Sequence, residues 1–487
     1  MGRNLVVLVG AGPGDPGLLT LRGYELLKEA DCVVYDYLAD ESILRFCRRD
    51  AELIDVGKRP DRPLLQDEIN EVLVGCASRH GLTVRLKGGD PFLFGRGGEE
   101  ADLLRSSGIS FDVVPGVSSA LAVPAYAGVP VTYRGLSNKV VVLTGHKIGG
   151  VHADINFEAL VSIEATIVIL MGVANRGYIS DKLIDAGMSP ETPVAAIRWG
   201  TRPEQETLRT KLGQLGRSEL SSPATIVIGD VAALNVDFFE SKALYGRRVG
   251  ILREASDAAK LANSISSLGA RPICFEAISS DVDPNSQVAL SELVKASGDY
   301  GSILFTSRRS VDALMRCVKD IRSLSGVKIF AVGRETEREL AKYKIVADLV
   351  GSTGAVNLMH DASKRYGDLL GVVLYPCSSK VSSERIEELN AIAKGKLRAV
   401  VSYQVIQNSP SKEWEDLLAS TDALLAFSPS QVDALGAKFF DGYDGVAIAV
   451  GATTKSALVQ LGARKVAVAE SPTDEALLDA LIEEFTQ

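Results

Sequence analysis

The sequence lacks long hydrophobic runs: none approaches the ~18–20 residues that a helix needs to span a bilayer. Its first apolar stretch, LVVLV (5–9), is short and leads into a glycine-rich loop instead of a signal-peptide cleavage site. Positive charge is also in deficit, with 53 Lys and Arg against 62 Asp and Glu. We therefore expect a cytoplasmic protein that binds neither membranes nor nucleic acid.

Cysteine and histidine are scarce, with six and four residues respectively, and no two cysteines form a C-x-x-C pair. A zinc ribbon or a thioredoxin-type redox site needs such a pair. His146 and His152 show no metal-ligand spacing either. The sequence therefore predicts isolated reduced thiols and no bound metal.

What the sequence does contain is an alternation of short β-branched runs with helix-length amphipathic stretches. CVVYDY (32–37) and TIVIGD (225–230) are typical of strands, and LLTLRGYELLKEA (18–30) is typical of a helix. This pattern predicts an α/β fold with largely parallel sheets. The 487 residues are enough for two to four domains. The pattern changes near residue 243, so we predict one domain over residues 1–243 and another over 244–487.

The second half contains an internal repeat. KIFAVGRETERELAKYK (328–344) aligns without a gap with VAIAVGATTKSALVQLG (446–462), and SILFTSRRSVDAL (302–314) resembles ALLAFSPSQVDAL (423–435). Each copy has the pattern of a strand, a polar turn and a helix. The repeat predicts two similar α/β lobes with a cleft between them.

The first half opens with a glycine-rich loop, VGAGPGDPGLLT (9–20), between a predicted strand and a predicted helix. Such a loop lets backbone amides approach a ligand closely. A nicotinamide-dependent oxidoreductase is one interpretation, because Asp36 ends the next strand, where a ribose-binding carboxylate would lie. The G-x-G-x-x-G fingerprint from Gly10 fails, however, because Asp15 occupies the position of its last glycine.

Four further motifs follow in the first half: RLKGGDPFLFGRGGEE (85–100), VVPGVSSALAVPAYAGVP (113–130), LMGVAN (170–175) and RWGTRPEQ (198–205). With the glycine loop, in this order and spacing, they resemble the tetrapyrrole methylase family over about residues 3–240, most of all its uroporphyrinogen-III C-methyltransferases. The resemblance implies an S-adenosylmethionine site between two α/β lobes. By position, its contacts would be Pro13, Gly88, Gly89, Asp90, Leu93, Ser118, Ser119, Met171, Gly200 and Ala224.

The same resemblance gives Asp36 the role of proton acceptor and Lys58 the role of proton donor. Its implied substrate carries eight carboxylates, so a protein of net charge −9 must concentrate positive charge locally. Lys and Arg side chains of the first half are the candidates, because arginine in particular pairs with carboxylates: Lys58, Arg59, Arg62, Arg96 and Arg134. The segment PDRPLLQDEIN (60–70) departs from the family, since it is about one residue shorter and lacks a histidine.

The residues of the second half show no nucleophile–base pair, metal cluster or phosphate loop, so they leave an enzyme and a binding module equally open. FAVGRETERELAKY, VVLYPCSSKVSSE and AFSPSQVDAL nevertheless resemble the uroporphyrinogen-III synthase family over about residues 247–487. The resemblance implies a discontinuous first lobe, about 247–281 plus 406–487, and a second lobe of about 283–403. By position, the substrate contacts would be Thr306, Ser307, Thr336, Tyr403, Ser428, Ser430 and Thr454.

Together, the two resemblances imply a bifunctional enzyme. Its second half would cyclise hydroxymethylbilane to uroporphyrinogen III, and its first half would methylate that product at C-2 and C-7. We expect the reaction to stop at precorrin-2, a precursor of sirohaem and cobalamin, because no dehydrogenase–ferrochelatase segment flanks these motifs. The family also suggests a homodimer through the methyltransferase half. The alternative is a methylase of a later corrin intermediate with a non-catalytic C-terminal binding module.

Overall fold

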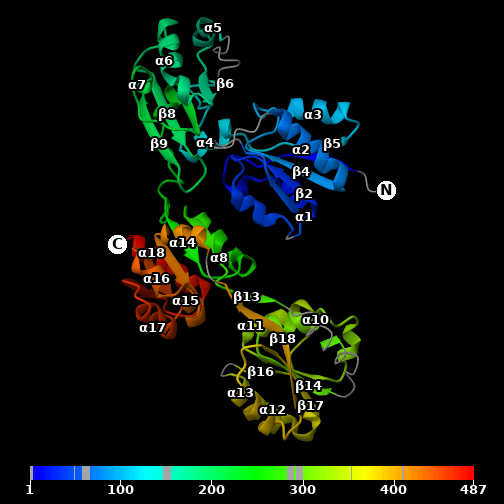
Figure 1. Cartoon of the computed structure of the whole chain (residues 1–487). Coiled ribbons are helices and arrows are strands. Elements are labelled where there is room, and N and C mark those ends of the chain that lie inside the picture. The colour runs from blue at the N-terminus through cyan, green and yellow to red at the C-terminus, as the bar shows by residue number, and fades with distance from the viewer. Residues whose placement is uncertain are drawn as a thin grey trace.

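A computed structural model describes residues 4–48, 50–57, 66–145, 155–281, 290–291, 300–351, 354–408 and 411–486. Four β-sheets, each packed against helices, succeed one another along an elongated molecule (Figure 1). Two of the sheets come from the first half of the chain and two from the second. The α/β architecture with two lobes in each half is therefore confirmed.

The first sheet is parallel, with strand order β3-β2-β4-β1-β5. Val7 and Val9 point into one hydrophobic cluster, while Val6 and Leu8 point into another, so both faces of the sheet are covered. The carboxyl ends of these strands share one edge, where the glycine-rich loops lie. The elements are β1 (Leu5–Gly10), α1 (Leu21–Glu29), β2 (Cys32–Tyr35), β3 (Glu52–Asp55), α2 (Gln66–Arg79), β4 (Leu82–Lys87), α3 (Gly97–Ser106) and β5 (Ser110–Val114).

The second sheet, in the order β6-β7-β10-β8-β9, is mainly antiparallel. The prediction of largely parallel sheets is wrong here, because residues 199–205 are too short to form the crossover that a parallel β8–β9 pair needs. Its elements are α4 (Ser119–Tyr126), β6 (Val140–Thr144), α5 (Phe157–Ser162), β7 (Thr166–Leu170), α6 (Arg176–Asp185), β8 (Pro193–Arg198), β9 (Glu206–Lys211), α7 (Leu212–Leu215) and β10 (Ala224–Ile228).

The third sheet joins two distant segments of the chain in the order β12-β11-β19-β20-β21. Its central pair is parallel and aligns Val249 of β11 with Ala423 of β19. The predicted discontinuous first lobe is therefore confirmed. Its elements are β11 (Arg248–Ile251), α8 (Ala255–Ser267), β12 (Arg271–Cys274), α14 (Lys412–Ala419), β19 (Ala423–Ala426), α15 (Pro429–Leu435), α16 (Ala437–Asp441), β20 (Val446–Ala449), α17 (Ala452–Gln460), β21 (Lys465–Val468) and α18 (Asp474–Thr486).

The fourth sheet lies between those two segments in the sequence and has the order β13-β18-β17-β14-β15-β16. Strands β13 and β18 pair antiparallel and run towards the third sheet, so they bridge the two lobes (Figure 1). The elements are β13 (Ile278–Asp281), β14 (Tyr300–Phe305), α10 (Arg308–Met315), β15 (Lys328–Val332), α11 (Arg334–Lys342), β16 (Leu349–Gly351), α12 (Ala355–Tyr366), β17 (Val372–Ser378), α13 (Ser383–Ile392) and β18 (Leu397–Gln407).

The internal repeat corresponds to matching strand–helix units in these two lobes. Ser307 and Ser428 cap the helices that follow β14 and β19, and each hydroxyl accepts a hydrogen bond from the amide three residues on. Both serines have φ of −157°. Thr336 and Thr454 occupy equivalent first turns of α11 and α17 and are both almost completely buried. The sequence similarity therefore reflects a repeated local structure.

The two halves of the chain contact each other through polar groups. A guanidinium nitrogen of Arg271 lies 2.8 Å from a carboxylate oxygen of Glu204, and the Tyr245 hydroxyl donates to the carbonyl of Gln205. Phe239 packs against Tyr126 of the first half and against Tyr245. The exact boundary near residue 243 stays a prediction. Among the described residues, no helix is long and apolar enough to cross a membrane.

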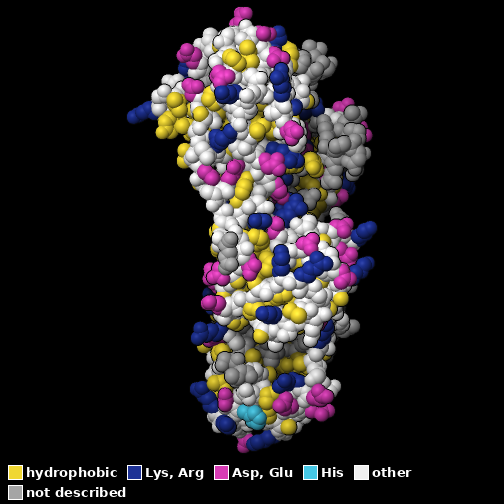
Figure 2. All heavy atoms as spheres, turned by 90° about the vertical axis from the view of Figure 1, so that its left-hand side faces the viewer, with side chains coloured by type: hydrophobic (Ala, Val, Ile, Leu, Met, Phe, Trp, Pro, Cys, Tyr) yellow, Lys and Arg dark blue, Asp and Glu magenta, His cyan; other side chains and the backbone are white. Residues whose placement is uncertain are grey.

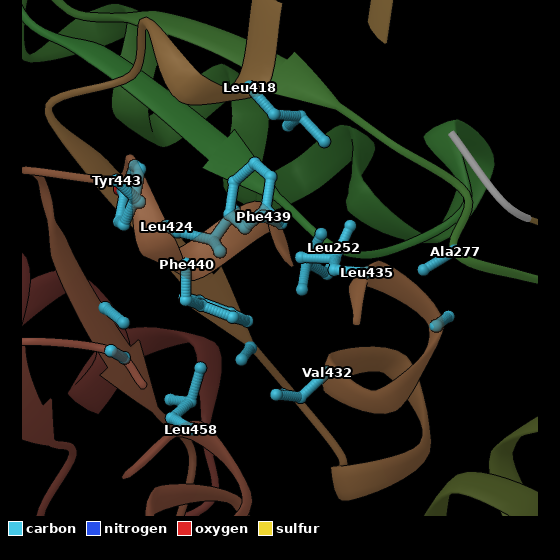
Figure 3. Close-up of a cluster of buried hydrophobic side chains, with 14 of the residues drawn as sticks. Leu252, Ala277, Leu418, Leu424, Val432, Leu435, Phe439, Phe440, Tyr443 and Leu458 are labelled. Atoms are coloured by element: carbon cyan, nitrogen blue, oxygen red, sulfur yellow. The ribbon is translucent and has the colours of Figure 1, made fainter. Parts of the chain in front are cut away.

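An aromatic core joins the two segments of the discontinuous lobe. Phe439 and Phe440 of α16 and Tyr443 pack with Leu424 of β19 and with Leu252, which lies beyond β11 (Figure 3). The rings of Phe439 and Phe440 meet edge to face, with centroids 5.0 Å apart. The burial of side chains from both segments is what makes them one lobe.

We predict that Phe440→Ala lowers the free energy of unfolding of this lobe by about 3–5 kcal/mol, because it leaves a cavity in a closed core. Val459→Ala is the control, since Val459 is 55% exposed on α17 and its truncation costs about 0.5 kcal/mol or less. Hydrogen exchange of the β19 and β20 amides measures both changes. Equal losses in the two variants would contradict this assignment of the core.

Candidate functional site

Three loops meet at the carboxyl edge of the first sheet, after β1, β4 and β5. The amide of Gly12 donates to the carbonyl of Gly89 at 3.2 Å, and the amide of Gly89 donates back to Gly12 at 2.7 Å. A Cβ on Gly10 would lie 2.5 Å from the Gly116 Cα, and one on Gly116 would lie 2.2 Å from the Gly89 oxygen. The loops therefore pack backbone against backbone, which no side chain at these positions would permit.

Asp90 holds two of these loops in place. One oxygen of its carboxylate accepts the amides of Phe92 and Leu93 at 2.8 and 3.1 Å, and the other accepts the amide of Gly116 at 3.0 Å. These bonds explain why an aspartate follows the glycine pair. Most of the residues predicted to contact S-adenosylmethionine in this lobe lie on these loops or on the start of α4, which Ser118 caps: Pro13, Gly88, Gly89, Asp90, Leu93, Ser118 and Ser119.

The second sheet contributes the remaining predicted contacts at one of its edges. Thr225 pairs with Leu170 and Ala224 pairs with Arg198, so Ala224 lies beside the strand ends that lead to Met171 and Gly200. Met171 has φ of 54°, in the left-handed region that non-glycine residues rarely adopt. Holding such a residue costs about 1–3 kcal/mol, and strain of this kind clusters at functional sites.

Two hydrogen bonds link the loop after β8 to the first lobe, one to the glycine loop and one to the loop after β2. The amide of Asp15 donates to the Thr201 hydroxyl at 3.1 Å, and Arg202 donates to the carbonyl of Leu38 at 3.1 Å. A Cβ on Gly14 would lie 2.6 Å from the Arg202 side chain. The structure thus brings Gly200 close to the first-lobe loops, as a ligand site between two lobes requires.

Asp36 follows β2 and belongs to a buried cluster of four charged groups, which we call the β4 charge cluster: Asp36, Arg85, Lys87 and Glu100. Nη2 of Arg85 donates to Asp36 Oδ1 at 2.5 Å, and Nε of Arg85 donates to Glu100 Oε1 at 3.2 Å. Nζ of Lys87 donates to the same Glu100 oxygen at 2.9 Å and lies 3.9 Å from Asp36 Oδ2. Two cations therefore bridge two carboxylates.

The members of this cluster differ in their exposure to solvent. The Glu100 side chain is fully buried, whereas 29% of the Asp36 side chain is exposed. Burial, followed by the neighbouring Arg85 cation, lowers the pKa of Lys87. Among the described residues, Oε2 of Glu100 has no hydrogen-bond partner. Asp36 is thus the carboxylate of the cluster that is partly exposed to solvent.

Sequence reasoning selected Asp36 but missed its three partners. Arg85 and Lys87 alternate with apolar residues on β4, the central strand of a sheet that is covered on both faces. Charges at such positions must be paired, since an isolated buried charge is too costly. The alternation of Arg85 and Lys87 with apolar residues was therefore the sequence signal for a buried charge cluster.

The structure describes only some of the Lys and Arg residues that were predicted to contact substrate carboxylates. Lys58, Arg59 and Arg62 lie outside the described residues, as do His146 and His152. The guanidinium of Arg96 pairs with Glu99 through two hydrogen bonds, and Arg134 is exposed on the turn between Tyr133 and Ser137. On the face shown in Figure 2, Lys and Arg side chains are interspersed with Asp and Glu side chains over both halves.

In the second half, several predicted hydroxyl-bearing residues lie at the ends of the fourth-sheet strands. The oxygens of Ser307 and Tyr403 are 3.0 Å apart, and Thr306 hydrogen-bonds Tyr375. Thr306 and Tyr375 also line a cavity of about 480 Å³ with Arg385 of α13 and the first turn of α12. Arg385 pairs at 3.2 Å with Glu388, which also lines the cavity, and the helix start is suited to an anionic group. Arg385 was not predicted from the sequence.

The remaining predicted substrate contacts of the second half do not line this cavity. The hydroxyls of Ser428 and Ser430 are 3.2 Å apart at the start of α15, in the first lobe. Thr336 and Thr454 are buried in helix packing, at 2% and 1% exposure. Arg308 of the second lobe lies 2.8 Å from Asp257 of the first lobe, so an ion pair links the lobes. The substrate roles of these hydroxyl groups stay predictions.

Comparison with known proteins gives two family matches. The family model of Tetrapyrrole (Corrin/Porphyrin) Methylases matches residues 5–216, and the model of Uroporphyrinogen-III synthase HemD matches residues 259–479. The chain is 34% identical to the porphyrin biosynthesis protein HemD of Ruminiclostridium josui, over 99% of this chain and 98% of that protein.

It is also 38% identical to the uroporphyrinogen-III C-methyltransferase of Bacillus subtilis strain 168, over 70% of this chain and 72% of that protein. A solved structure of uroporphyrin-III C-methyl transferase from Thermus thermophilus, complexed with S-adenyl homocysteine, shares 40% identity with it. That match covers 47% of this chain and 98% of the other, with a TM-score of 0.42.

We predict that Glu100→Gln lowers the free energy of unfolding of the first lobe by about 3–5 kcal/mol, because it leaves Arg85 and Lys87 with one carboxylate between them. Glu99→Gln removes the adjacent glutamate, which is 59% exposed and pairs on the surface with Arg96. That control costs about 1 kcal/mol or less. Urea unfolding of both variants tests the difference, and a Glu100→Gln protein as stable as the control would rule out a structural role for the pairing.

Proposed function

Because the chain belongs to the tetrapyrrole methylases in its first half and to the uroporphyrinogen-III synthases in its second half, we propose that it catalyses two consecutive reactions. The second half closes hydroxymethylbilane to uroporphyrinogen III. The first half then transfers methyl groups from S-adenosylmethionine to C-2 and C-7 of that product, giving precorrin-2. One observation carries this proposal: both family models match a single chain, and the product of one family is the methyl acceptor of the other.

The geometry of the glycine loops fits S-adenosylmethionine. Gly10 and Gly116 allow the loop backbones to approach one another, and the second-lobe loop is linked to the glycine loop through Thr201. When bound, S-adenosylmethionine supplies a methyl group on a cationic sulfonium. The loops would orient that methyl group in line with an electron-rich pyrrole carbon, and orientation of this kind is a large part of catalysis.

We assign Asp36 the role of proton acceptor in this proposal. Methylation leaves a proton to be removed from the macrocycle, and a carboxylate can take it as a general base. Arg85 donates a hydrogen bond to one oxygen of Asp36 and so fixes its carboxylate. The exposed part of that carboxylate remains available to a substrate. Donation of a proton by Lys58 is also part of the proposal.

We predict that Asp36→Asn lowers kcat for methyl transfer by about 10²–10⁴-fold, the usual contribution of a general base. Binding of S-adenosylmethionine, measured by calorimetry, should be unchanged. Asp102→Asn, at a 73% exposed carboxylate on α3, is the matched control and should retain full kcat. An Asp36→Asn enzyme that turns over like this control would exclude Asp36 as the base.

For the synthase half, we propose that the hydroxyl groups and Arg385 fold the substrate for ring closure. Loss of hydroxide from hydroxymethylbilane leaves a stabilised azafulvene cation, so the site must mainly hold the chain in shape and exclude water. Arg385 would pair with a substrate carboxylate, and the Ser307–Tyr403 pair would contact the ring that inverts. The proposal also includes Ser428 and Ser430 at the start of α15, and Thr336 and Thr454 in the first turns of α11 and α17.

We predict that Tyr403→Phe lowers the ratio of the type III to the type I isomer by about two- to tenfold, since one hydrogen bond contributes about 0.5–1.5 kcal/mol. Type I uroporphyrinogen forms when ring closure occurs without inversion. Tyr366→Phe removes a hydroxyl that bonds the Asp348 carbonyl in the same lobe, and it should leave the ratio unchanged. Chromatographic separation of the two isomers measures this ratio. An unaltered ratio in Tyr403→Phe would exclude Tyr403 as a substrate contact.

The whole proposal is tested by supplying the full chain with hydroxymethylbilane and S-adenosylmethionine. Formation of dimethylated precorrin-2 supports both activities. Type I uroporphyrinogen alone would contradict the synthase assignment. Type III uroporphyrinogen without methylation would contradict the methyltransferase assignment. We also propose a homodimer through the methyltransferase half, which sedimentation of the full chain would detect.

A further inference from the structure

Four metal-ligating side chains lie at the edge of the first sheet opposite to the glycine loops. Cys32 is the first residue of β2 and Glu52 is the first residue of β3. Cys76 lies near the end of α2, and His80 directly follows that helix. Because the amino ends of parallel strands share an edge, three separate elements bring a thiol, a carboxylate, a second thiol and an imidazole together.

The local geometry aligns these groups. The amide of His80 donates to the carbonyl of Cys76 at 3.0 Å, so the helical turn continues and places both side chains on one face. His80 Nε2 lies 2.6 Å from Glu52 Oε2. The ligand atoms of Cys32, Glu52 and His80 all lie within 4.8 Å of one another. Cys76 is buried in the same side-chain cluster as Cys32.

The surroundings of the two thiols suit sulfur ligands of a cation. Both cysteines are fully buried, and the Arg79 guanidinium donates to the Cys76 sulfur at 3.7 Å. Arg79 therefore places a positive charge beside the sulfur atoms, which favours a thiolate ligand.

We propose that Cys32, Cys76, His80 and Glu52 bind one thiophilic divalent cation of the Zn²⁺ type. Two sulfur ligands with one nitrogen and one oxygen are typical of a tetrahedral zinc site, whereas Mg²⁺ and Ca²⁺ prefer oxygen ligands alone. Two thiolates and the Glu52 carboxylate carry three negative charges. The cation and Arg79, 3.7 Å from Glu52, balance them.

Binding of the cation releases the protons of the Cys32 and Cys76 thiols to solvent. It forms four metal–ligand bonds without any change of oxidation state. The site would tie β2, β3 and α2 together at the edge of the sheet remote from Asp36, so its role is structural. It does not depend on either proposed reaction. The sequence prediction of no metal came from the lack of a C-x-x-C pair, whereas these ligands come from three elements.

The test uses the full chain, stripped with a chelator and then dialysed against Zn²⁺. We expect one zinc per chain by elemental analysis and a higher Tm than for the stripped protein. Addition of Co²⁺ to the stripped protein should produce a thiolate-to-cobalt charge-transfer absorption. A wild-type chain without stoichiometric zinc would overturn the proposal, as would a Cys32–Cys76 disulfide found by mass spectrometry in the reduced preparation.

Variants then assign the ligands. The double variant Cys32→Ser/Cys76→Ser should abolish the cobalt absorption and each single variant should lower it, while Cys47→Ser, in the same lobe but outside the cluster, should retain it in full. His80→Ala leaves the hydrophobic core intact and should weaken zinc binding at least about tenfold, a loss that even outer partners of a metal site produce. His360→Ala, at a histidine exposed on α12, is its control. Undiminished zinc binding in His80→Ala and Cys76→Ser would refute this ligand set.

Discussion

The first lobe depends on the buried carboxylate of Glu100. This group lies on α3, yet it accepts hydrogen bonds from both cations of β4, so it fixes the helix to the central strand. Without it, two positive charges would face the interior with only Asp36 to balance them, and burial of unpaired charge is among the most costly defects in a protein. The same pairing sets the orientation of Arg85, which in turn holds the carboxylate proposed to accept the substrate's proton.

A second constraint is the close approach of backbones at the carboxyl edge of the first sheet. Three loops meet there because Gly10 and Gly116 have no side chain and Gly89 adopts a φ of +65°, and Asp90 supplies the hydrogen bonds that hold two of the loops in position. The charge cluster and the glycine loops both adjoin the carboxyl end of β4, since Lys87 ends that strand and the glycine pair follows it.

Local sequence patterns predicted much of this organisation. The glycine motifs located the loops because their spacing reports a local backbone requirement, and the internal repeat predicted the matching units capped by Ser307 and Ser428. The direction of the strands in the second sheet was wrongly predicted, because β-branched runs look alike in parallel and antiparallel strands. Arg85 and Lys87 were not predicted to be buried, because a charged residue is expected to be exposed when the neighbouring strands are not known.

The sequence by itself determined the α/β class, the order of the motifs and the resemblance of each half to a family, since these depend on residues close together in the chain. Only the tertiary structure decided which distant groups meet. It joined β11 to β19 across an inserted lobe, paired Glu100 with two cations of β4, and brought Cys32, Glu52 and His80 to one edge of a sheet. The physical reason is that burial and charge pairing act through space, and their partners are chosen by the packing of whole elements.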